Sequence, residues 1–101
     1  MPEIQTMLCL STGHLPQHVR DDMDLIAAPG ADFSPNEWRS RILATNWFGY
    51  GWIIYVPEDE EQDIPLPIAL SDCIAFGRSQ RAGFIKFDTD VEPVADLTLY
   101  E

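Results

Sequence analysis

The order of apolar and polar positions divides the chain into strands and helices. Residues 4–10 predict a first strand, because their side chains alternate between two faces. One face holds Ile4, Thr6, Leu8 and Leu10, and the other holds Met7 and Cys9. After a break at residues 11–13, Pro16 suits the first turn of a helix, which ends at Pro29-Gly30. Its apolar stripe consists of Leu15, Val19, Met23 and Ile26.

The middle of the chain is rich in β-branched and aromatic residues. Residues 42–47 and 52–56 lie on either side of a turn that contains glycine, and this arrangement predicts a β-hairpin. Just before the hairpin, Ser34 and Glu37 have the spacing of a capping box, with Ser34 as the cap. We therefore expect a short helical turn around Trp38.

The last third of the chain predicts one more helix and one more strand. Pro65 and Pro67 introduce a helix that ends near Arg81, where the helix dipole favours cations. Residues 84–87 have the composition of a fourth strand. Residues 97–100 are expected to add a short segment at the edge of the sheet.

These elements follow one another in the order β-α-β-β-α-β. We therefore predict a single α+β domain over residues 1–101, with two helices packed on one face of a four-stranded, mostly antiparallel sheet in ferredoxin-like order. A mixed sheet of another topology uses the same elements, so the strand order stays open.

Charge is the most unusual property of the composition. The chain has 17 acidic and 6 basic residues, which gives a net charge of −11. Solubility of a small domain requires a magnitude of only about 2–8. The negative charge argues against direct binding of DNA or RNA, where Lys and Arg neutralise phosphates. No apolar stretch approaches the length of a membrane helix and no signal peptide is visible, so we expect a cytoplasmic protein without a membrane partner.

The acidic residues are concentrated in two blocks, and we predict that these blocks bind a partner. The first block is Glu58, Asp59, Glu60, Glu61 and Asp63, and the second is Asp88, Asp90 and Glu92. Asp21, Asp22 and Asp24 also fall away from the apolar stripe of the first helix. Phe48 and Tyr50 at the hairpin turn are expected to serve as aromatic anchors of a protein interface.

Other site types have weaker support in the residues. Asp88, Asp90 and Glu92 alternate after a strand, which leaves a divalent-metal-dependent enzyme as an alternative. No nucleophile elbow or phosphate-binding glycine loop is present, so we expect no enzyme and no cofactor. Cys9 and Cys73 are expected to be buried, reduced thiols.

The two histidines do not form an obvious metal site. His14 and His18 are four residues apart, but Pro16 lies between them and breaks the helical geometry that a shared metal requires. We therefore expect a turn histidine and a solvent-facing helical histidine.

The segment Leu8–Leu15, LCLSTGHL, resembles the opening of a family of small uncharacterised proteins carried by phages, plasmids and prophages. Similar features follow along most of the chain: the strand that ends in residues 55–58, the helix of residues 66–81, the strand of residues 84–88 and the tail of residues 96–100. The resemblance implies a mobile-element setting, in which small acidic proteins inhibit host defence, as anti-CRISPR and antirestriction proteins do.

Charge and resemblance together lead to one functional hypothesis. The chain is expected to bind and inhibit a nucleic-acid-handling defence complex in the bacterial host, with its carboxylates imitating nucleic-acid phosphates on a basic protein or ribonucleoprotein surface. The alternatives are a non-catalytic accessory or regulatory module that binds another protein of the element, and the metal-dependent enzyme. The sequence leaves the identity of the partner and the oligomeric state open.

Overall fold

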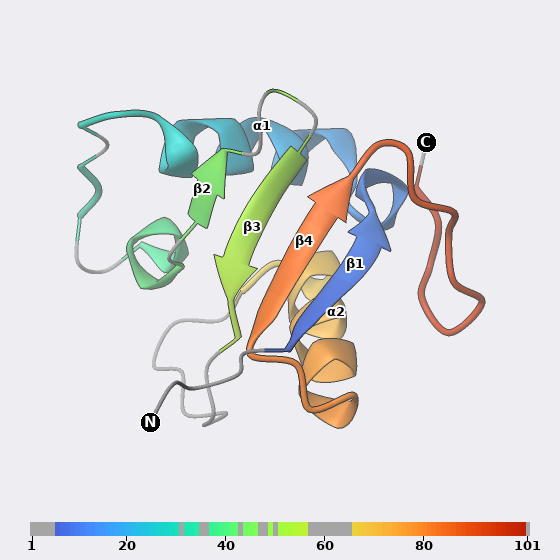
Figure 1. Ribbon diagram of the computed structural model, residues 1–101. Helices are drawn as coiled ribbons and strands as arrows, with labels where there is room; N and C mark the ends of the chain where they lie inside the picture. Colours follow the sequence, from blue (N-terminus) through green and yellow to red (C-terminus); the bar gives the residue numbers. More distant parts are fainter. Residues whose placement is uncertain are drawn as a thin grey trace.

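The computed structural model describes residues 6–30, 32–34, 37–42, 44–46, 49, 51–56 and 66–100. Within these residues the strands and helices occur in the predicted order (Figure 1), which confirms the α+β class. The elements are β1 (Met7–Ser11), η1 (Thr12–His14), α1 (Gln17–Ala27), η2 (Trp38–Arg41), β2 (Ala44–Asn46), β3 (Gly51–Tyr55), α2 (Ile68–Ser79) and β4 (Phe84–Asp88).

The described strands form one four-stranded sheet in the order β1-β4-β3-β2. β3 runs antiparallel to both β2 and β4, whereas β1 lies at an edge and runs parallel to β4. The sheet is therefore mixed, the topology that the sequence had left open. Because Ser11 is in register with Asp88, β1 and β4 end at the same end of the sheet.

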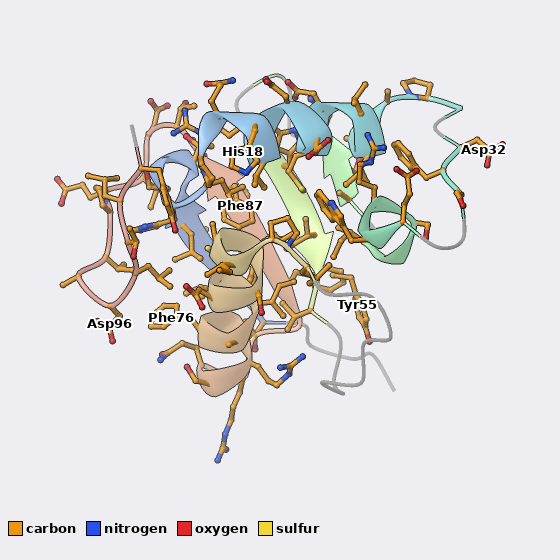
Figure 2. All side chains as sticks on the ribbon, turned by 180° about the vertical axis from the view of Figure 1, so that it is seen from behind. His18, Asp32, Tyr55, Phe76, Phe87 and Asp96 are labelled. Atoms are coloured by element: carbon orange, nitrogen blue, oxygen red, sulfur yellow. The ribbon has the colours of Figure 1, made fainter. Side chains whose placement is uncertain are left out.

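Both helices cover the same face of the sheet, behind it in Figure 1 and in front of it in Figure 2. Phe87 of β4 lies between the helices and the sheet (Figure 2) and is completely buried, as are Ile85 beside it and Met23 of α1. The approach of α2 to β4 is close: a Cβ atom on Gly77 would lie 2.8 Å from Cδ1 of Ile85. The core therefore consists of one layer between the sheet and the two helices.

No described helix covers the other face of the sheet (Figure 1). Strand alternation directs nine side chains toward it: Met7, Cys9 and Ser11 of β1, Thr45 of β2, Ile53 and Tyr55 of β3, and Phe84, Lys86 and Asp88 of β4. We call this surface the open face. The Tyr55 and Phe84 rings form an edge-to-face pair on it, with centroids 5.9 Å apart.

The predicted patterns of the first strand and helix are confirmed within the described residues. Leu10 is completely buried while Cys9 is exposed, and Val19 belongs to the buried stripe of α1. Pro16 is the residue before the first turn of α1, not a member of it.

The predicted capping box does not form. The residue that precedes η2 is Glu37, and Ser34 instead uses its backbone carbonyl to accept the Glu37 N–H, at 3.0 Å. The Glu37 carboxylate pairs with the Arg39 guanidinium at 2.5 Å, and this interaction between opposite charges competes with a reach back to the cap. The helical turn at Trp38 is a short 3₁₀ turn.

The predicted edge segment at residues 97–100 is also wrong. This part of the chain is not a strand, and together with residues 94–96 it crosses the turn between β1 and α1. We call residues 94–100 the C-terminal strap. The Tyr100 N–H donates to the Gly13 carbonyl at 2.6 Å, and Leu99 lies against Gly13. Contacts with the turn therefore replace pairing with the sheet.

Candidate functional site

Two distant segments that carry acidic residues, α1 and the turn after β4, line one hollow at the end of the sheet where β1 and β4 finish. α1 crosses this end and carries Asp21 and Asp24, while Asp88 is the last residue of β4 and Asp90 lies in the turn that follows. We call these four carboxylates the acidic end. Asp21 and Asp90 are exposed, so their charge is available to a partner.

A polar hollow of about 250 Å³ lies inside the acidic end. It is lined by Gln17, Arg20 and Asp24 of α1, by Asn46 and Trp52 of the β2–β3 hairpin and by Thr89 of the turn after β4. The Trp52 indole N–H donates to Asp24 Oδ1 at 3.0 Å, and the Gln17 amide donates to Asp21 Oδ1 at 2.9 Å. These bonds hold two carboxylates in place without neutralising them.

Nearby cations are already engaged in other contacts. The Arg39 guanidinium binds Asp22 at 3.4 Å in addition to Glu37, and the pKa of Arg39 is raised by its hydrogen bond to Glu37. The Arg20 Nε–H donates to the Leu15 carbonyl at 2.6 Å. Among the described residues, the Arg39 guanidinium thus pairs with Asp22 and Glu37 rather than with Asp21 or Asp90, and Arg20 binds a backbone carbonyl.

In the second acidic block, the carboxylate of Asp88 is engaged in contacts within the protein, whereas Asp90 and Glu92 are exposed to solvent. Asp88 Oδ1 accepts the Asp90 N–H at 2.9 Å, and its Oδ2 lies 3.7 Å from Lys86 Nζ. Among the residues that the structure describes, no three His, Cys, Asp or Glu side chains lie close enough together to hold a metal ion.

The remaining predicted site residues lie outside the described residues. They are Glu58, Asp59, Glu60, Glu61 and Asp63 of the first block and the aromatic anchors Phe48 and Tyr50. The described residue before the first block, Val56, pairs with Gly83 at the start of β4, whereas Asp88 is at its end. The length of β4, about 13 Å at about 3.3 Å per residue, separates these two positions.

The structure assigns His14 a role that the sequence pattern did not reveal. It lies in the turn, as predicted, but it is 1% exposed and both ring nitrogens bind backbone groups of the strap. The surrounding motif is structural throughout: the Ser11 hydroxyl accepts the Gly13 N–H at 3.0 Å, and Leu10 and Leu15 are buried. His18 is exposed on α1, as predicted.

The two cysteines differ strongly in environment. Cys73 of α2 is buried, as predicted, and burial together with the charge of Asp72 raises the pKa of its thiol to about 12. Cys9 is exposed, which corrects the prediction of burial, because β1 turns it to the open face. Both thiols are free, and the sheet separates them.

The open face contains a shallow, mostly apolar hollow. It is lined by Thr45, Ile53, Tyr55 and Phe84 together with Ala44 and Ile54. Tyr55 is 43% exposed and Met7 of the neighbouring edge strand is 44% exposed. Such a surface can bury apolar area against another protein.

Comparison with known proteins identifies a family but not an activity. The chain matches a family of unknown function, DUF5983, in its C-terminal domain, over residues 7–101, and it therefore belongs to that family. No curated protein and no solved structure was found to be significantly similar to the chain. No helix in the described part of the chain is long and apolar enough to cross a membrane.

Proposed function

We propose that this member of a family of unknown function is a non-catalytic protein-binding module whose acidic end docks on a cationic surface of a partner. The observation that carries the proposal is the hollow that α1 and the turn after β4 share, with Asp24 in its lining, Asp21 exposed on the same helix and Asp90 exposed in the turn. Two segments that are far apart in the sequence thus add their charges at one end of the molecule.

The proposed docking is electrostatic. Exposed carboxylates attract the Lys and Arg side chains of a partner over roughly one Debye length, about 8 Å at physiological salt, and they accelerate and orient association. We propose that a cationic side chain of the partner binds at the polar hollow, where Asp24 and the Asn46 and Thr89 side chains offer oxygen acceptors. Arg20 also lines the hollow, but its guanidinium donates to the Leu15 and Tyr100 carbonyls. Binding of this kind weakens as the salt concentration rises.

We further propose that the partner is a nucleic-acid-handling defence complex of a bacterial host, which the chain inhibits as a mobile-element protein. A surface that binds phosphates is lined with Lys and Arg and therefore also attracts carboxylates. The net charge of −11 and the position of the acidic end support this proposal.

Charge reversal at the acidic end tests the docking. Purified nuclease and CRISPR effector complexes are tested for binding to the wild-type protein and to Asp21→Lys/Asp90→Lys. These two residues are chosen because both are exposed and neither side chain is bonded to Trp52. We expect the double variant to lose affinity about tenfold or more, and the wild-type affinity to fall between about 50 mM and about 300 mM salt.

The matched control is Asp32→Lys/Asp96→Lys. It changes the net charge by the same amount at two exposed residues on opposite sides of the molecule (Figure 2). We expect this control to change affinity less than about twofold. Equal losses in both double variants, or binding without salt dependence, would contradict docking through the acidic end.

The open face supports a second candidate function, a module that binds its partner through apolar contacts. The specific observation is a group of exposed Met7 and Tyr55 with half-buried Ile53 and Phe84 on a sheet face that no described helix covers. Tyr55→Ala would then weaken binding while added salt would not, since burial of apolar area does not depend on charge. The response to salt therefore separates the two candidates.

A further inference from the structure

The C-terminal strap is anchored on a buried histidine. His14 Nδ1 lies 2.9 Å from the Thr98 carbonyl oxygen, and the Val94 N–H donates to His14 Nε2 at 3.0 Å. A ring nitrogen that accepts a hydrogen bond carries no proton, so these partners assign a neutral ring with its proton on Nδ1. The neutral form therefore binds the strap at two places.

A second proton on the ring breaks only one of the two bonds. Protonation at Nε2 directs an N–H at the Val94 N–H, and two donors cannot bond to each other. The Nδ1–H continues to donate to Thr98 in both forms. Because His14 is 1% exposed, water does not reach the ring to compensate for the lost acceptor while the strap is closed. The imidazolium thus favours a state in which Val94 has moved away.

Several charged or titratable groups lie around this ring. Asp72 and Cys73 of α2 and Tyr100 of the strap share its immediate surroundings. Arg20 of α1 donates to the Leu15 carbonyl and, at 3.5 Å, to the Tyr100 carbonyl. Asp72 and Arg20 carry opposite charges, while Cys73 stays neutral because burial raises its pKa to about 12.

The strap also covers a specific part of the core. Leu97 packs against the buried cluster and lines the same small space as Cys73 and His14. Farther along, the Tyr100 N–H bond to Gly13 fixes the end of the strap independently of the ring. Loss of the Val94 bond therefore frees the first part of the strap, residues 94–97, and leaves residues 98–100 attached.

We propose that His14 is a pH-sensitive latch, a device that goes beyond the docking function. In its neutral form it holds residues 94–97 against α2, and its protonation in mildly acidic solution releases them and uncovers Cys73. The geometry that carries the proposal is the pair of backbone bonds to one buried imidazole, of which only the Val94 bond depends on the absence of a proton.

Reactivity of the Cys73 thiol measures the opening. In the Cys9→Ser protein, Cys73 is treated with dithiodipyridine, a disulfide reagent that reacts with thiols in acidic as well as neutral solution. The reaction rate of the Cys73 thiol is divided by the reaction rate of free cysteine with the same reagent at the same pH. We expect this ratio to rise about tenfold between about pH 7.5 and about pH 5, the interval in which histidine gains its charge. The near-ultraviolet circular dichroism of the aromatic side chains should stay unchanged, since the core remains folded.

Two variants test the assignment to His14. His14→Gln keeps one donor and one acceptor but cannot take a proton, so its ratio should be the same at both pH values. His18→Gln removes the exposed histidine of α1 and should keep the wild-type response. A ratio that does not change with pH in the Cys9→Ser protein overturns the latch, as does a pH response that survives in His14→Gln.

Amide hydrogen exchange in the wild-type protein provides a test that needs no variant. After correction for the intrinsic dependence of exchange on pH, the Val94 amide should lose protection at about pH 5 while the Ile85 and Phe87 amides of β4 keep theirs. Unchanged protection of Val94, or equal loss at Val94 and in β4, contradicts a local latch.

Discussion

The two faces of the sheet are made by the same strands but are used differently. On β4, Ile85 and Phe87 point toward the helices and are completely buried, whereas Phe84 and Lys86, which alternate with them, belong to the open face and are only partly buried. The helix-covered face therefore carries most of the folding energy. The open face keeps Met7 and the Tyr55–Phe84 pair exposed without a helix to cover them. These apolar side chains are therefore available for binding, because folding depends little on them.

We expect the largest loss of stability from substitution of Phe87, and Phe84 of the same strand serves as the comparison. Phe87→Ala removes a completely buried ring and leaves a cavity, so we expect it to lower the free energy of unfolding by about 4 kcal/mol. Phe84→Ala removes a half-buried ring from the open face and should cost about 1 kcal/mol. Urea denaturation followed by tryptophan fluorescence measures both. Equal costs would show that the open face is part of the core.

Substitution of two glycines that line the polar hollow, Gly49 and Gly51, tests how closely the backbone of β3 approaches β4. A Cβ atom on Gly51 would meet the Phe87 carbonyl oxygen at 1.7 Å, at a φ of +157°. Gly51→Ala should therefore cost about 3 kcal/mol, because backbone atoms must move. Gly49→Ala has a φ of +80° but no atom within 4 Å, so it should cost only about 1 kcal/mol. Equal melting temperatures of the two variants would refute the close approach.

The two cysteines differ in their expected effect on how the free energy of unfolding depends on pH. The pKa of Cys73 is raised to about 12 from an ordinary value near 9.0, so the unfolded chain loses this proton at lower pH than the folded protein does. The thiol contributes stability that is fully present below about pH 9 and is lost as the pH rises toward about 12. We expect Cys73→Ala to flatten the decrease in the free energy of unfolding above pH 9. Cys9→Ala is the control and should leave that decrease as in the wild type. Urea denaturation at several alkaline pH values measures this decrease for each variant.

The smallest expected effect concerns the aromatic pair of the open face. Tyr55→Leu keeps an apolar side chain on β3 but removes the edge-to-face contact with Phe84, which is worth about 0.5–1.5 kcal/mol beyond area burial. Since Tyr55 is 43% exposed, we expect a loss near the lower limit. A cost above about 2 kcal/mol in urea denaturation would indicate that this face contributes to folding after all.

Only part of the acidic end could be predicted from the sequence. Spacing alone places Asp21 and Asp24 off the apolar stripe of a helix, and it places Asp88 and Asp90 just after a strand. That α1 and the turn after β4 meet at one hollow depends on β4 lying beside β1 and on α1 crossing the end of both. Strand pairing between distant segments has no local signature, so the sequence could not predict this meeting.

Alternation and helical spacing along the chain predicted its strands and helices, because these patterns reflect which side chains must leave water. The net charge also follows from composition alone. Long-range packing, by contrast, makes β1 run parallel to β4 at an edge, binds residues 97–100 to the β1–α1 turn and buries His14 beneath them. The physical reason is that these outcomes depend on contacts between residues more than 70 positions apart, such as His14 with Val94 at a separation of 80. Their energies depend on a geometry that no local pattern encodes.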